Sequence, residues 1–197
     1  MKKTPQQFKR ENVRSVFLKV LGESSTKLAP LSISCSESLN DDFTTTDFSF
    51  EESGKKSKII SLENIKGSGF VDGLFCGLYE NYVNDYKSIK KIKLVDIMVN
   101  PIMKASKKLG SEARASVVLS VEVDKHGIAE FQHESRSMIY SCFASALEAF
   151  QFYINCERSF HRIKLVIADA TERNRGDIIQ KCMNDLSKLT EVNTYAE

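Results

Sequence analysis

The sequence predicts an α+β protein made of two βββα units, with antiparallel sheets and helices packed on one face. Two stretches, residues 31–65 and 91–133, alternate polar and apolar residues as strands do. A run with the apolar spacing of a helix follows each stretch. The same order occurs twice, which indicates an internal structural duplication. An N-terminal helix and a C-terminal strand–helix extension complete the predicted fold.

The N-terminal segment, residues 1–30, is predicted to be a helix and a connector. Pro5 suits the first turn of a helix, and Gly22 suits its end. Residues 23–30 are polar and end in Pro30, which indicates the connector. One face of the helix is apolar, and it holds Val13, Val16, Phe17, Val20 and Leu21.

The first unit is predicted to have strands over residues 31–35, 43–50 and 57–65. The stretches between them are rich in turn-forming residues. A helix should follow from Val71, with Ser68 as its N-cap. Its apolar stripe is Val71, Leu74, Phe75, Leu78, Tyr79, Tyr82 and Tyr86.

The second unit repeats this order, with predicted strands over 91–99, 113–123 and 128–133. A tight turn at 124–127 joins the last two strands. A second helix should start near Ser137, and residues 31–155 together would form one domain. The apolar side of that helix holds Met138, Ile139, Cys142, Phe143, Ala146, Phe150, Tyr153 and Ile154.

The remaining residues, 156–197, are predicted to add a strand and a covering helix. The run 163–168 is rich in β-branched and aliphatic residues, which favours a strand. A polar break at 169–176 separates it from a helix over 177–190.

Composition excludes several classes of protein. The chain is 42% apolar and carries a net charge of +2, as expected of a soluble globular protein without a nucleic-acid-binding field. Lysines cluster at 55–58, 87–93 and 104–108, where a solvated surface is favoured over a phosphate-binding groove. The N-terminus lacks the apolar region of a signal peptide, and no run is long enough to span a membrane.

The five cysteines are dispersed and form no Cys-x-x-Cys pair. Reduced thiols in a cytoplasmic protein are therefore expected, and a zinc site is not. His126, His133 and His161 lack metal-ligand spacing, and no nucleophile motif is present. The sequence predicts no catalysis, no metal and no cofactor.

The junction 67–75 joins the predicted third strand to the first helix. Its glycines let the backbone turn sharply, and the helix start offers unpaired N–H groups. Two interpretations stay open for this corner. It is either a site for a small anion such as a carboxylate, or an ordinary strand-to-helix turn.

Four short motifs occur in order along residues 31–155. Residues 67–74 read Gly-Ser-Gly-Phe-Val-Asp-Gly-Leu, and 94–97 read Leu-Val-Asp-Ile. Residues 112–115 read Glu-Ala-Arg-Ala, and 138–151 form an alanine-containing apolar helix. In this order the motifs resemble the C-terminal regulatory (allosteric dimerisation) domain of alpha-isopropylmalate synthase and citramalate synthase.

The chain departs from that family at several positions. Phe70 stands where the family has proline, Gly73 where it has alanine, and Ile97 where it has a tyrosine that walls the effector pocket. Residues 133–137 replace a glycine-rich lead into the second helix, and the catalytic barrel of the synthases is missing.

The resemblance implies a non-catalytic effector-sensing and dimerisation module. Two chains would pair, with leucine or isoleucine bound near the interface, and a separate synthase catalytic subunit would be a further partner. The positions carried over to the ligand site are Ser68, Gly69, Val71, Asp72, Val95, Ile97, Pro101, Ala113 and Ala115. The alternatives are a pure interaction module with a filled pocket and, less favoured, a nucleic-acid-binding protein.

Overall fold

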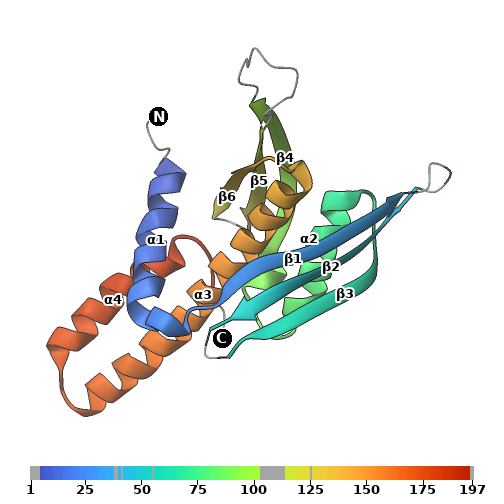
Figure 1. Cartoon of the computed structure of the whole chain (residues 1–197). Helices are drawn as coiled ribbons and strands as arrows, with labels where there is room; N and C mark the ends of the chain where they lie inside the picture. Colours follow the sequence, from blue (N-terminus) through green and yellow to red (C-terminus); the bar gives the residue numbers. More distant parts are fainter. Residues whose placement is uncertain are drawn as a thin grey trace.

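Two three-stranded antiparallel sheets form the body of the protein in the computed structural model (Figure 1). The structure describes residues 5–37, 40, 42–54, 56–102, 114–124 and 126–195. The first sheet has the order β1 (Lys27–Glu37), β2 (Thr44–Ser53), β3 (Lys58–Gly67), and the second β4 (Ile92–Ile102), β5 (Arg114–Val123), β6 (Gly127–Ser135). The predicted α+β class and the duplicated βββα order are therefore confirmed.

The helices are α1 (Pro5–Leu21), α2 (Phe70–Tyr82), α3 (Met138–Glu172) and α4 (Gly176–Thr190), with short 3-10 turns at Gly22–Ser24 and Ile89–Lys91. α2 packs on β2 and β3, whereas α3 packs on β5 and β6 of the second sheet and also on β1 of the first. The two sheets therefore share α3 as a common support. None of the described helices combines the length and apolar character needed to cross a membrane.

The middle of α3 is largely buried because sheets and helices pack around it. Its half-buried positions Ala144, Glu148, Gln151 and Arg158 form one stripe at helical spacing, and a run of buried residues covers the rest. The run is Ser141, Cys142, Phe143, Ser145, Ala146, Leu147, Ala149, Phe150, Phe152, Tyr153, Ile154, Asn155, Cys156 and Glu157. Aromatic contacts extend it in both directions, since Phe143 meets Phe48 of β2 and Tyr153 meets Phe131 of β6.

Polar groups on α3 hold the chain segments that pass over it. The Asn155 side chain accepts a hydrogen bond from the Thr26 N–H and donates one to the Thr26 carbonyl, both at 2.8 Å. The Glu157 carboxylate accepts from the N–H groups of Lys87 and Ser88 at 3.0 and 2.7 Å. Thr26, Lys87 and Ser88 lie outside the strands, so these bonds satisfy main-chain groups that have no partner in a sheet.

The predicted strand at 163–168 is wrong, because these residues continue α3. No glycine or proline interrupts residues 138–172, so nothing in the chain ends the helix. The buried residues Phe160, Ile163 and Ala170, with half-buried Ile167 between them, repeat at helical spacing. Packing of this stripe against α1 and α4 outweighs the strand propensity of the β-branched residues.

The predicted connector at 23–30 is shorter than expected. α1 ends at Leu21 as predicted, and Gly22 adopts a φ of +55°, which suits glycine at a helix end. β1 then begins at Lys27 and runs through Pro30, where its register with β2 shifts. Proline is tolerated there because β1 is an edge strand and the shift is a bulge.

The extension packs as helices rather than as a strand and a helix. α4 turns back along α3, and α1 lies against both of them (Figure 1). Lys19 of α1 forms a 2.7 Å ion pair with Asp185 of α4, and this bond raises the pKa of Lys19. After α4, the Asn193 amide donates to the Ser88 carbonyl at 3.3 Å, and the Tyr195 ring stacks on Phe160 at 4.7 Å.

We predict that Asn155→Leu lowers the free energy of unfolding by about 3 kcal/mol, because it leaves the buried N–H and carbonyl of Thr26 unpaired. The matched control is Gln151→Leu, which removes one partly exposed bond to the Leu28 N–H. That change should cost about 1 kcal/mol. Urea unfolding of both variants measures the difference, and equal losses would contradict the role given to Asn155.

Candidate functional site: the start of α2 and the edge of the second sheet

The predicted ligand-site residues fall into two sets. Ser68, Gly69, Val71 and Asp72 lie at the start of α2, which packs on the first sheet. The others lie on the second sheet, namely Val95, Ile97 and Pro101 on β4 and Ala115 on β5. Ala113 lies outside the described residues.

Within each set the structure brings some members into direct contact. Ser68 bonds to Asp72, and Pro101 lies opposite Ala115 in the β4–β5 ladder. Ile97 instead pairs with Leu119, and Val95 sits where the register shifts between Leu94 and Asp96. Among the described residues no hydrogen bond joins the first set to the second.

At the start of α2, the protein's own carboxylate occupies the position expected for a capping group. Asp72 accepts hydrogen bonds from the Ser68 N–H at 2.9 Å and from the Ser68 hydroxyl at 3.2 Å. The predicted Ser68 N-cap is wrong, since Gly69 is the N-cap and has no side chain to bond the helix. The negative charge of Asp72 already interacts favourably with the helix dipole, so this corner favours a cation over a second anion.

The main chain is tightly packed just before this corner. A Cβ atom on Gly67 would lie 2.2 Å from the Gly73 nitrogen, a distance that no real side chain adopts. A Cβ atom on Gly69 would meet nothing within 4 Å. Gly67 is therefore required by the close approach of the last residue of β3 to the first turn of α2, whatever the corner binds.

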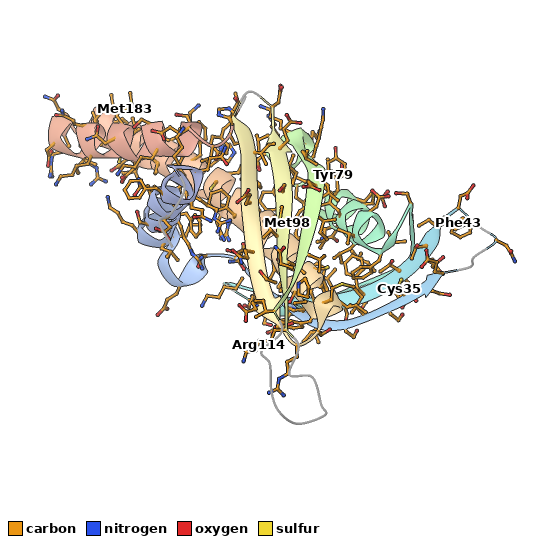
Figure 2. The ribbon with its side chains drawn as sticks, turned by 90° about the horizontal axis from the view of Figure 1, so that it is seen from above. Cys35, Phe43, Tyr79, Met98, Arg114 and Met183 are labelled. Atoms are coloured by element: carbon orange, nitrogen blue, oxygen red, sulfur yellow. The ribbon has the colours of Figure 1, made fainter. Side chains whose placement is uncertain are left out.

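β4 is an open edge of the second sheet, and it pairs only with β5 among the described strands. Three large apolar residues on it are exposed, Val95 at 48%, Met98 at 54% and Val99 at 41%. Figure 2 looks onto this sheet and shows Met98 on its open face. An apolar edge of this kind is a site for pairing with another strand.

The other sheet edges also carry exposed apolar residues, Ile59 on β3 and Leu31 on β1, together with features that protect an edge. β3 carries exposed Lys58, Glu63 and Lys66, and its Asn64 has a φ of +57° that interrupts the strand. The exposed positions of β1 include three serines, but also Leu31, and α1 packs against β6. Charge, irregular backbone and cover are the usual protections of an edge strand. Between Val95 and Val99, β4 has the charge of Asp96 and the register shift at Val95.

The cysteines form no disulfide in the described part of the chain. Burial raises the pKa of the Cys142 thiol to about 11 and raises that of Cys156 further. Both thiols therefore stay protonated and are packing groups rather than nucleophiles at neutral pH. No trio of His, Cys, Asp or Glu side chains in the described ranges is arranged to hold a metal ion.

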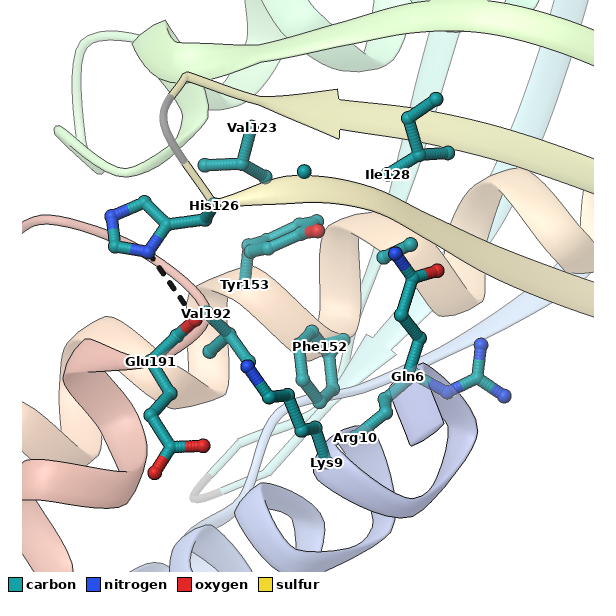
Figure 3. A pocket seen from close by; sticks show the side chains of 12 residues that line it. Gln6, Lys9, Arg10, Val123, His126, Ile128, Phe152, Tyr153, Glu191 and Val192 are labelled. Atoms are coloured by element: carbon teal, nitrogen blue, oxygen red, sulfur yellow. Dashed lines mark hydrogen bonds between the residues drawn. The ribbon is translucent and has the colours of Figure 1, made fainter. Parts of the chain in front are cut away.

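His126 makes long-range contacts that the sequence does not predict, because the local pattern indicates only a hairpin turn (Figure 3). Its Nδ1 lies 3.2 Å from the Glu191 carbonyl, and its Nε2 lies 2.8 Å from the Thr194 hydroxyl. Because a carbonyl oxygen only accepts, Nδ1 carries the proton. The partners lie more than sixty positions away, and no local pattern signals a contact over that separation.

We predict that Gly67→Ala destabilises the fold by about 3 kcal/mol, because the added methyl group forces two main-chain segments apart. Gly69→Ala is the matched control, since its φ of −175° suits any residue and its Cβ has open space. It should cost at most about 1 kcal/mol, the value of an N-cap change. Thermal unfolding of both variants tests the prediction, and a tolerated Gly67→Ala would contradict it.

Comparison with known proteins adds no family to this geometry. The sequence matches no protein-family model and no curated protein. Function is therefore inferred from the residues and contacts described above, together with the motif resemblance over residues 31–155.

Proposed function

We propose that this chain is a non-catalytic module that pairs with a second copy of itself through β4. The observation that carries this proposal is the open edge of β4, where Val95, Met98 and Val99 are all exposed. Strand addition at such an edge satisfies main-chain groups and covers apolar side chains in one step. The dimer implied by the motif resemblance supports the same conclusion.

The β4 edge is complementary to itself, as a twofold interface requires. In an antiparallel pair with its axis at Ile97, Val95 would lie opposite Val99 of the partner subunit. Both faces of the strand contribute apolar atoms, because Met98 and Val99 point to opposite sides. The second sheets of the two copies would then join into one continuous sheet of six strands.

A second candidate function is the binding of a branched-chain amino acid at the start of α2. The confirmed βββα-βββα order and the motif at residues 67–74 support it. Asp72 would hold the ammonium group, since its carboxylate is only half-buried. In this case the module would sense leucine or isoleucine and act on a separate synthase catalytic subunit.

The proposal places the module in the cytoplasm and gives it no role on nucleic acid. Free thiols, two of them buried, suit a reducing compartment. The lysine cluster at 104–108 lies outside the described residues, and its neighbours on β4 are apolar rather than basic.

Val99→Lys should weaken self-association at least roughly 100-fold, because the twofold places two buried charges in each interface. Sedimentation equilibrium over a range of protein concentrations measures the dissociation constant. Ile59→Lys is the matched control, since Ile59 is 70% exposed on the edge strand of the first sheet. It should leave the dissociation constant unchanged.

Two results would contradict the pairing proposal. One is a wild-type chain that sediments as a monomer at every concentration tested. The other is an equal loss of association in Val99→Lys and Ile59→Lys, which would indicate a general effect of added charge. Far-ultraviolet circular dichroism confirms that each variant is folded.

For the second candidate, leucine or isoleucine should release or absorb heat on titration into the full chain, and Asp72→Asn should abolish the signal. Removing the carboxylate leaves the ammonium group without its counter-charge. The control is Asp85→Asn, an exposed aspartate in the turn after α2. Absence of heat with both amino acids, or equal effects of the two variants, would exclude sensing at this corner.

A further inference from the structure

An open groove lies on the helical side of the molecule, along the seam between α3 and α4. It offers about 300 Å³ of room, a volume within the range of sites that take up ligand or partner side chains. Residues of α1, α3 and α4 line it, and none of the lining residues comes from α2 or from either sheet. The groove is therefore separate from the start of α2 and from the β4 edge.

The groove continues the place that α1 already occupies. α1 packs as a third helix on both α3 and α4, and its last turn borders the groove with Lys19 and Val20. Gly22 then turns the chain away toward β1, whereas the hairpin of α3 and α4 extends further (Figure 1). The uncovered part of the seam has a shape that suits a helix, because the side chains of a third helix fit between the ridges of two packed helices.

The floor of the groove is apolar and reachable from solvent. Ile163 and Val166 lie three positions apart on α3, and Ile178 and Cys182 lie four apart on α4, so each pair shares one face of its helix. Ile163 is buried, but Val166 is 42% exposed and the two α4 residues are only half-buried. All residues of α4 are described, and Leu189 alone among them is buried. The apolar stripe of α4 is therefore incompletely covered within this chain.

Positive charge borders the floor on both helices. Arg162 of α3 and Lys181 of α4 line the groove, and neither forms an ion pair or a hydrogen bond with any residue that the structure describes. Lys19 adds a third cation, but it is paired with Asp185 at 2.7 Å. Asp185 is the one acid in the lining, so two positive charges are left without a counter-charge.

This combination of floor and charge distinguishes between possible occupants. Nucleic acid would satisfy the cations but would leave the apolar floor uncovered. A second copy joined groove to groove would set like charges against each other, since a twofold contact brings the same residues together. An amphipathic helix with acidic flanks satisfies both the floor and the cations.

We propose that this groove binds an amphipathic helix of a partner protein. The partner helix carries apolar residues at positions i, i+3, i+4 and i+7 and acidic residues on both flanks of that stripe. Its apolar side chains cover Val166, Ile178 and Cys182, and its carboxylates pair with Arg162 and Lys181. It occupies the seam beyond the last turn of α1.

The test uses the full chain and a fluorescein-labelled helical peptide built from repeats of Glu-Leu-Glu-Ala-Leu-Leu-Glu. Two control peptides have lysine in place of glutamate, or alanine in place of leucine. Fluorescence anisotropy at fixed ionic strength measures the dissociation constants. The acidic peptide should bind saturably, and each control should bind at least roughly tenfold more weakly, because one loses the ion pairs and the other the apolar contact.

Charge reversal on the two helices tests the ion pairs. Arg162→Glu and Lys181→Glu should each weaken binding of the acidic peptide roughly tenfold, because like charges then face each other. The double variant should bind the lysine peptide in place of the acidic one. Arg136→Glu is the matched control, since Arg136 is exposed in the bend before α3, and it should leave the dissociation constants unchanged.

A second pair of variants tests the floor. Val166→Asn should weaken binding of the acidic peptide roughly tenfold, because it removes apolar contact at the centre of the groove. Leu165→Asn is the matched control, since Leu165 is 73% exposed at the neighbouring position of α3 and does not line the groove. Thermal unfolding verifies that both variants are folded. Val99→Lys should leave peptide binding unchanged, which separates this inference from pairing through β4.

The proposal is overturned if the acidic peptide fails to bind saturably or if the lysine peptide binds as tightly. It is equally overturned if Arg136→Glu or Leu165→Asn loses as much affinity as the groove variants. Two further results would assign the groove to another occupant. A change in self-association caused by Arg162→Glu would indicate a second copy, and displacement of the peptide by phosphatidylserine vesicles would indicate a membrane surface.

Discussion

The paired hydrogen bonds between Asn155 and the main chain of Thr26 fix the point at which the first sheet begins against α3. Thr26 precedes β1, the edge strand of the first sheet, whereas Asn155 lies in the part of α3 that supports the second sheet. A side-chain amide can bond a peptide N–H and a peptide carbonyl at once, because it accepts through its oxygen and donates through its nitrogen. With this contact made, both sheets are placed on the same helix, and the core can close between them.

Most of the fold follows from local patterns, because in each unit the apolar residues recur first every two positions, as in strands, and then every 3.6 positions, as in a helix. The helix of the first unit, α2, begins at Phe70, next to the predicted Val71. The helix of the second unit, α3, begins at Met138, next to the predicted Ser137. The failure at 163–168 has a definite cause. The local β propensity of these residues favours a strand. The helix is favoured only once α1 and α4 cover the apolar stripe from Phe160 to Ala170.

The candidate sites were less predictable for a related reason. At the start of α2, the sequence predicted a strand-to-helix junction, but the direction of capping depended on where Asp72 points. The open character of β4 depends on which strands neighbour it, and this is a property of the sheet order. The contacts of His126 with Glu191 and Thr194 are further from prediction, because no local pattern signals them.

The anchoring of the segment after α4 also affects how the molecule opens. Lys91 donates to the Thr194 carbonyl at 2.5 Å, His126 holds the Thr194 side chain, and Tyr195 is buried against Phe160. A segment held in this way does not fray from its end as an unattached tail does. The segment after α4, the β5–β6 hairpin and the helices α1, α3 and α4 would therefore separate together, as one cooperative unit. Amide hydrogens of α4 would exchange with solvent only in that opening.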